Sequence, residues 1–305
     1  MRADSPDDRS REISAEFPFE SRYVEVLGSR MHYVEVGEGP AVLFVHGNPT
    51  WSYLWRNVIP YVAPVARCVA VDLIGMGLSD KPECEYRFFD HARYFEAAVD
   101  ALGLDAVTLV LHDWGSAVGF DWASRHESRV SGLVFMEAFL MPVGGFEVFP
   151  DGVRDAFRAF RTPQLGWDLL VKQNQFIEKV LPGSVARSLS DEELENYRRP
   201  FQNESDRVPL WRWPNEIPIG GEPADVDAMM RTYSAWLQRT RVPKLMLHAE
   251  PGVLIPAPVA AWAQAHLPEL TSRAIGRGIH YVQEDQPHAI GQAIAQWLVA
   301  MRGWP

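Results

Sequence analysis

The stretch "VTLVLHDWGSAVGFDWASRH", residues 107–126, predicts a buried strand that turns sharply into a helix. Its first part is a short run rich in Val and Leu, which is typical of a strand covered on both faces of a parallel sheet. Its second part places apolar residues about three and four apart, so a helix formed there can cover one face of that sheet. A strand, a tight turn and a helix in this order indicate an α/β fold.

Runs of the same kind lie on both sides of this stretch. The N-terminal segment "RYVEVLGSRMHYVEVG" predicts a hairpin, and further strands are predicted in "AVLFVHG", "CVAVDLIG", "GLVFMEA", "VPKLMLHAE" and "TSRAIG". Helical patterns separate the strands, and "AIGQAIAQWLVAM" predicts a closing helix. We therefore predict a mostly parallel eight-stranded sheet with helices on both faces.

The alternation of strands and helices is interrupted after residue 138. Residues 139–241 are helical in pattern, rich in Trp, Phe and Pro, and contain no convincing strand. We predict that they form a helical cap domain inserted into a core domain of residues 19–138 and 242–305. Residues 1–18 are polar and acid-rich, and we predict a disordered acidic tail there.

Composition excludes several classes of function. The net charge is -11 and no basic run occurs, which argues against a nucleic-acid or membrane partner. No segment holds the roughly 18 uninterrupted apolar residues of a membrane span, and the N-terminus lacks the apolar part of a secretory signal. We expect a cytoplasmic protein. Two cysteines, Cys68 and Cys84, are too few for a disulfide framework or a four-cysteine zinc site.

Chemically unusual residues occur where four of the predicted segments end. Ligands of open parallel sheets bind at the carboxyl ends of the strands. These ends carry Asn48 in "FVHGNPT", Asp113 in "VLHDWGS", Glu137 in "VFMEAF" and, just before the last helix, His280 in "GIHYVQEDQP". The sequence therefore predicts a functional site at this edge of the sheet.

Asp113 occupies the position of a nucleophile. The nucleophile elbow Gly-x-Ser-x-Gly exposes a serine between a strand and a helix. Here Asp113 replaces the serine and Leu111 the first glycine, while Gly115 supplies space for the turn. Serine suits attack on a carbonyl, whereas a carboxylate suits displacement of a leaving group from saturated carbon. The enzyme's carboxyl group then becomes an ester that water must hydrolyse.

Hydrolysis of such an ester needs a general base, usually a neutral imidazole held by a buried carboxylate. His280 is the candidate, and a core histidine with no catalytic part is the alternative at this position. We expect His288 to cap the last helix or contact solvent. His46 and His112 are expected to satisfy local backbone groups.

The carboxylate partner of His280 has two candidates. In the turn "HAEPGVLIP", Pro251 stands where an acid is expected, and Glu250 lies one residue earlier. Glu137 is flanked by apolar residues and would be costly to bury without a partner, which His280 would provide. We predict Glu137, with Glu250 as the possible substitute.

Two neutral donors follow the neighbouring strand ends. The indole N–H of Trp114 and the side-chain amide of Asn48 suit a soft anion such as halide. Their backbone N–H groups could form the oxyanion hole of the hydrolysis step. The alternatives are a packing residue for Trp114 and a turn former before Pro49 for Asn48.

These motifs resemble the haloalkane dehalogenases of the α/β-hydrolase superfamily. The resemblance rests on "HGNPTWSYLWRNVIP", "LHDWGSAVGFDWA", "VFMEAF" and "GIHYVQEDQPHAIGQAIAQWL", and covers nearly the whole chain from about Phe19. The segments "FIEKVLP", "YRRPF" and "PLWRWPNEIPIGGEPADV" resemble the cap of the subfamily that uses a glutamate as the catalytic acid.

The resemblance implies five roles: Asp113 as nucleophile, His280 as general base, Glu137 as catalytic acid, and Asn48 and Trp114 as halide-binding residues. It implies hydrolysis of a small halogenated aliphatic substrate to a primary or secondary alcohol, a halide ion and a proton. No metal and no cofactor are implied. We expect a monomer or a homodimer.

The resemblance also implies a substrate pocket beneath the cap. The matching positions are Phe176, Trp213, Pro214, Ile217 and Leu254. Trp213 stands where relatives often have Phe, and "AFLMP" after Glu137 departs from their commoner pattern. Both differences bear on the preferred chain length of the substrate.

Three other functions are compatible with parts of this pattern. An epoxide hydrolase shares the His-Asp-Trp-Gly elbow but needs cap tyrosines, and only Tyr197 and Tyr233 lie in the insertion. A luciferase-like oxygenase resembles the family and keeps the same five residue types, so light emission with coelenterazine would distinguish it. A ligand-binding receptor on this scaffold would retain its ligand without turnover.

Overall fold

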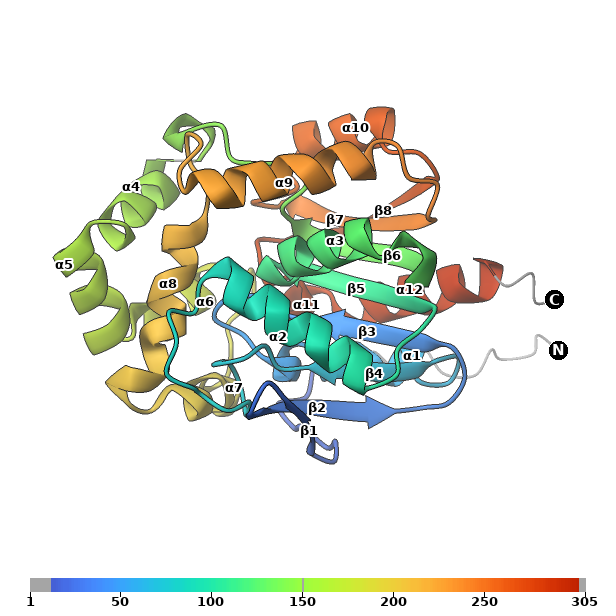
Figure 1. Ribbon diagram of the computed structural model, residues 1–305, viewed down its shortest axis with the longest axis horizontal. Helices are drawn as coiled ribbons and strands as arrows, with labels where there is room; N and C mark the ends of the chain where they lie inside the picture. The colour runs from blue at the N-terminus through green and yellow to red at the C-terminus, as the bar shows by residue number, and fades with distance from the viewer. Residues whose placement is uncertain (1–11, 150, 302–305) are drawn as a thin grey trace, which may run out of the picture.

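An eight-stranded sheet forms the centre of the computed structural model, which describes residues 12–149 and 151–301 (Figure 1). The strand order is β1-β2-β4-β3-β5-β6-β7-β8. The strands are β1 (Arg22–Val26), β2 (Ser29–Val36), β3 (Ala41–Val45), β4 (Arg67–Val71), β5 (Val107–Asp113), β6 (Val130–Ala138), β7 (Lys244–Pro251) and β8 (Leu270–Gly278). β1 and β2 form the predicted hairpin and β2 is antiparallel to β4, whereas all other neighbours are parallel. The predicted mostly parallel sheet is confirmed.

Helices cover both faces of the sheet (Figure 1). The core helices are α1 (Ile59–Val62), α2 (Phe88–Ala101), α3 (Trp114–Arg125), α9 (Ala224–Leu237), α10 (Ala257–His266), α11 (Val282–Asp285) and α12 (Pro287–Met301). On one face α3 packs against both α2 and α9, and on the other α1 packs against α12 (Figure 1). Within the part of the chain that the structure describes, no helix is long and apolar enough to cross a membrane.

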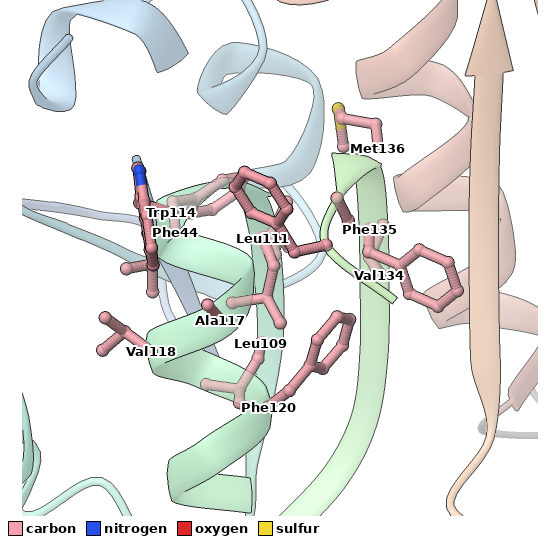
Figure 2. Close-up of a cluster of buried hydrophobic side chains, with 14 of the residues drawn as sticks. Phe44, Leu109, Leu111, Trp114, Ala117, Val118, Phe120, Val134, Phe135 and Met136 are labelled. Carbon is pink, nitrogen blue, oxygen red and sulfur yellow. The ribbon is translucent and has the colours of Figure 1, made fainter. Parts of the chain in front are cut away.

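The strand and helix of the opening motif form the centre of the core. Every residue of β5 is buried, as its Val- and Leu-rich sequence predicts. Leu109 and Leu111 of β5 lie beside Ala117 and Phe120 of α3, as Figure 2 shows. The ring of Phe120 meets that of Phe135 on β6 edge-on, with 5.6 Å between the centroids. This packing fixes the start of α3, and therefore Asp113, relative to the sheet.

Most of the segment between β6 and β7 lies beyond the carboxyl ends of the parallel strands (Figure 1). Its elements are η3 (Phe146–Val148), α4 (Asp151–Phe160), α5 (Pro163–Trp167), η4 (Asp168–Lys172), η5 (Phe176–Val180), α6 (Leu181–Gly183), α7 (Asp191–Arg198), η6 (Arg199–Phe201), η7 (Glu204–Arg207) and α8 (Val208–Glu216). α9 instead packs against α3, and the Tyr233 hydroxyl donates to the Phe139 carbonyl oxygen at 2.7 Å. We therefore propose a cap of residues 139–223, shorter than the expected 139–241, with α9 in the core.

Residues 12–18 pack against aromatic side chains of the core. The hydroxyl group of Tyr53 donates to the Ala15 carbonyl oxygen at 2.6 Å, and the rings of Phe17 and Tyr53 lie 5.8 Å apart. The predicted disorder is therefore wrong for residues 12–18, because aromatic side chains of the core provide packing partners that the local sequence does not reveal. The rest of that prediction, for residues 1–11, lies outside the described residues.

Candidate active site

Asp113 ends β5 and directly precedes α3, with a backbone φ of 49° and ψ of -129°. A positive φ is uncommon for a residue other than glycine, and such backbone strain is concentrated at functional sites. The turn is tight, because a Cβ atom at Gly115 would lie 2.4 Å from the carbonyl oxygens of both Val45 and His46. A Cβ atom at Gly47 would lie 2.2 Å from Asp113 Oδ1. The elbow therefore requires glycine at both positions.

The two carboxylate oxygens of Asp113 have different surroundings. Oδ1 accepts a hydrogen bond from the backbone N–H of Asn48 at 2.7 Å, whereas Oδ2 lies 3.4 Å from Nε2 of His280. Burial raises the pKa of Asp113, but interactions with His280 and with the backbone N–H of Trp114 outweigh it, so the pKa lies below its ordinary value. Asp113 is therefore ionised at neutral pH.

Glu137, at the end of β6, holds the other side of the His280 imidazole. Its Oε2 atom lies 3.1 Å from Nδ1 of His280, and the Glu137 side chain is 1% exposed. Three backbone N–H groups, of Val253, Leu254 and Ile255, donate to the same carboxylate at 2.9, 2.8 and 3.2 Å. The loop after β7 thus solvates a carboxylate that burial would otherwise disfavour.

His280 lies between two carboxylates, which determine its protonation. Burial lowers the pKa of His280, but the interactions with Asp113 and Glu137 are stronger together and raise it to about 9. At neutral pH the His280 imidazole is therefore protonated and positively charged, while the Asp113 carboxylate is ionised and not esterified. Glu250, the alternative acid, is exposed near the end of β7.

The other histidines occupy supporting positions. Nε2 of His112 donates to the carbonyl oxygen of His280 at 2.9 Å, and burial lowers the pKa of His112 to about 3, so it is neutral. His46 bonds the carbonyl oxygen of Gly47, as expected for a residue that satisfies local backbone groups. Nδ1 of His288 lies 2.9 Å from the Tyr61 hydroxyl, away from this site.

The two predicted halide donors lie next to Asp113. The Asn48 side chain is buried, and its amide nitrogen lies at the long distance of 3.4 Å from the Leu210 carbonyl oxygen. The Trp114 indole stacks on Trp213, with 4.5 Å between centroids, and Trp213 stacks in turn on His91 at 4.1 Å. These stacks fix the plane of the Trp114 ring beside Asp113.

A cavity of about 310 Å³ opens over Asp113 between the core and the cap. Asn48, Trp114 and His280 line it, together with Phe176, Pro214, Ile217 and Leu254 from the predicted pocket. Trp213 is absent from the residues that line the cavity, and the prediction for it is corrected. Its side chain is fully buried in the stack between Trp114 and His91, so it contacts the predicted halide donor Trp114 rather than the cavity.

One wall of the cavity was missing from the sequence prediction. The apolar side chains of α4 that line it, besides Gly152, belong to Val153, Ala156, Phe157 and Phe160, spaced at i, i+3, i+4 and i+7. This spacing is typical of one apolar face of a helix, and it is visible in the sequence alone. Because α4 lies in the cap, away from the sheet, its apolar face is free to cover the substrate space.

The hydroxyl groups of both insertion tyrosines have other partners, and neither residue lines the cavity. The Tyr197 hydroxyl bonds the carboxylate of Glu284, and the Tyr233 hydroxyl donates to the Phe139 carbonyl oxygen. Neither hydroxyl is therefore available to protonate an epoxide over Asp113. Among the described residues, no cluster of three or more His, Cys, Asp or Glu side chains could hold a metal ion.

The fold and the elbow define the general class. Residues 40–287 match the family model of the alpha/beta hydrolase fold, and the chain belongs to this family. In it, the nucleophile follows the central strand at a sharp turn, which is the position of Asp113 here.

Comparison with individual proteins identifies the branch. The chain is 48% identical over 278 residues to a haloalkane dehalogenase of Mesorhizobium japonicum, covering 90% of each chain. It is 46% identical to one of Sphingobium indicum, covering 93% of this chain and 97% of the relative. The crystal structure of haloalkane dehalogenase DbeA from Bradyrhizobium elkani superposes with a TM-score of 0.91 at 44% identity, covering 93% and 99%. The chain belongs to the haloalkane dehalogenases.

Proposed function

We propose that this protein hydrolyses haloalkanes to an alcohol, a halide ion and a proton in two steps through Asp113. The observation that carries the proposal is an ionised carboxylate at the elbow, in contact with an imidazole and open to an apolar cavity. The relatives named above are haloalkane dehalogenases and support the same reaction.

In the first step, Oδ2 of Asp113 attacks the carbon that carries the halogen, and the electron pair of the carbon–halogen bond leaves with the halide. The side chains of Trp114 and Asn48 donate to the departing halide. Oδ1 remains bonded to the backbone N–H of Asn48, which leaves Oδ2 as the attacking atom. The product is an alkyl ester of Asp113.

In the second step, water attacks the carboxyl carbon of this ester while His280 accepts a proton from the water. The imidazole must be neutral to do so, although its pKa in the free protein is about 9. Formation of the ester removes the charge of Asp113 and therefore lowers this pKa. Glu137 stabilises the imidazolium, and the backbone N–H groups of Asn48 and Trp114 stabilise the oxyanion. Collapse of the intermediate breaks the bond to the alkoxy oxygen, which takes up the second proton of the attacking water and leaves as the alcohol, while Asp113 returns to the carboxylate.

The test is release of halide and protons from 1-bromobutane and 1,2-dibromoethane. We expect turnover by the wild type, a loss of at least about 10⁴-fold in Asp113→Asn, and a His280→Phe variant that gains the mass of one butyl group. His288→Phe is the matched control and should turn over normally, because His288 lies outside the site. A wild type that releases no halide from either substrate would refute the proposal, and epoxides and coelenterazine would then be tested.

A further inference from the structure

One charged side chain lines the cavity without a part in the proposed chemistry. Among the described lining residues, only Asp113, His280 and Lys179 carry ionisable side chains of Asp, Glu, His, Lys or Arg. Lys179 lies on η5 in the cap, three residues after Phe176, whose side chain lines the interior. The few polar groups of a mostly apolar pocket orient its ligand, and an ammonium group pairs with an anion rather than with an uncharged alkyl chain.

Lys179 lies at the mouth of the cavity. Three of the lining residues are exposed, namely Gly152, Lys179 and Gly183, whereas Asp113 and Phe176 at the interior are buried. The exposed residues come from the start of α4 and from the adjoining elements η5 and α6. A substrate whose halogen-bearing carbon faces Asp113 and whose chain extends toward solvent therefore has its other end beside Lys179.

The positive charge of Lys179 is not neutralised by a neighbour. Glu178, beside it in sequence, forms an ion pair with Arg198 at 2.7 Å, and Asp151 on α4 pairs with Arg154. In the described part of the chain, no ion pair involves Lys179. The net charge of -11 makes the molecule as a whole repel anions. The ammonium group of Lys179 attracts an anion locally, at the mouth of the cavity.

We propose that Lys179 selects haloalkanes that carry a carboxylate at the end opposite to the halogen. The carboxylate pairs with the Lys179 ammonium group at the mouth while the halogen-bearing carbon faces Asp113. Asp113 displaces the halide with its electron pair, water hydrolyses the ester, and the product is the corresponding hydroxy acid. This substrate class rests on the proposed dehalogenation and specifies which haloalkanes the same site prefers.

The experiment compares kcat/KM for 4-bromobutanoate, 6-bromohexanoate and 8-bromooctanoate with that for the methyl ester of each. The acid-to-ester ratio isolates the contribution of the carboxylate. We expect the ratio to pass through a maximum at the chain length that spans the cavity, to fall about fivefold in Lys179→Gln, and to fall further in Lys179→Glu. High salt should lower the wild-type ratio, because Lys179 is exposed.

Lys172→Gln is the matched control, since Lys172 is an exposed cap lysine that pairs with Asp168 and does not line the cavity. It changes the net charge equally and should keep the wild-type ratio. Equal ratios in the wild type and Lys179→Gln would overturn the role of Lys179, as would an equal fall in Lys172→Gln. If neither the acids nor the esters release bromide, the proposed dehalogenation fails and this inference fails with it. Turnover of the esters without any preference for acids overturns the inference alone.

Discussion

Replacing Glu284 by glutamine should destabilise the protein through a buried ionic cluster that joins the cap to the core. The Glu284 carboxylate is fully buried and accepts from both Nη atoms of Arg56, at 2.5 and 2.9 Å, and from Arg187 at 2.6 Å. Both arginines also bind Glu193 of α7, at 2.8 and 2.6 Å, and Tyr197 of α7 bonds Glu284. Two arginines and two glutamates thus neutralise each other; Arg56 and both glutamates are buried, and Arg187 is 26% exposed.

The size of the effect follows from the charge that is left behind. Glu284→Gln keeps the shape of the side chain but leaves Arg56, whose side chain is 1% exposed, with Glu193 as its remaining acidic partner. Removing one member of a buried ion pair costs about 3–5 kcal/mol. Because glutamine still offers one acceptor oxygen, we expect about 3 kcal/mol, which corresponds to a fall in Tm of about 5 °C for a chain of this length.

Urea unfolding, followed by tryptophan fluorescence, measures this loss as a lower midpoint at unchanged slope. The double variant Arg56→Met with Glu284→Met is the control, because replacing both partners by apolar groups removes the unpaired charge. It should recover at least half of the lost free energy of unfolding. A Glu284→Gln midpoint equal to that of the wild type, or a double variant less stable than Glu284→Gln, would refute the reasoning.

Two further results are expected. In Asp113→Asn, the pKa of His280 measured by NMR should fall well below about 9, because the charge of Asp113 helps to raise it; a pKa still near 9 would show that Glu137 alone holds the proton. Gly115→Ala should lose halide release and about 3 kcal/mol of stability, because the new Cβ atom would lie 2.4 Å from two carbonyl oxygens. Gly144→Ala is the control. A Cβ atom there would meet open space, so this variant should match the wild type in both assays.

The sequence was sufficient to predict the residues at the strand ends, because each signal there is local. A buried strand has a continuous apolar run, and the polar residue that ends it stands out, as Asp113 and Glu137 do. Neighbouring parallel strands end at the same edge of the sheet. The residues that follow them can therefore be predicted to lie close together before any distance is known. The structure brings both next to His280, at 3.4 and 3.1 Å.

Interactions between distant segments were not predictable in this way. Neither the packing of residues 12–18 nor the stacking of Trp213 between His91 and Trp114 leaves a local pattern. The same is true of the Glu284 cluster, whose members are more than 200 positions apart at the extremes. The sequence shows that a residue is a glutamate or an arginine but not whether its side chain is buried, which depends on the packing.

The segment that carries His280, the proposed general base, is hydrogen-bonded to the cap. The backbone N–H groups of His280 and Tyr281 donate to the Ser184 carbonyl oxygen at 3.0 and 3.2 Å, and Asp285 accepts from the backbone of Ala186. Ser184 also lines the cavity. A displacement of this part of the cap would therefore move His280 together with the wall that contacts the substrate. Because base and wall share these bonds, substitutions in the cap that alter substrate preference should also alter the rate of ester hydrolysis, and the two effects can be separated only by measuring both steps.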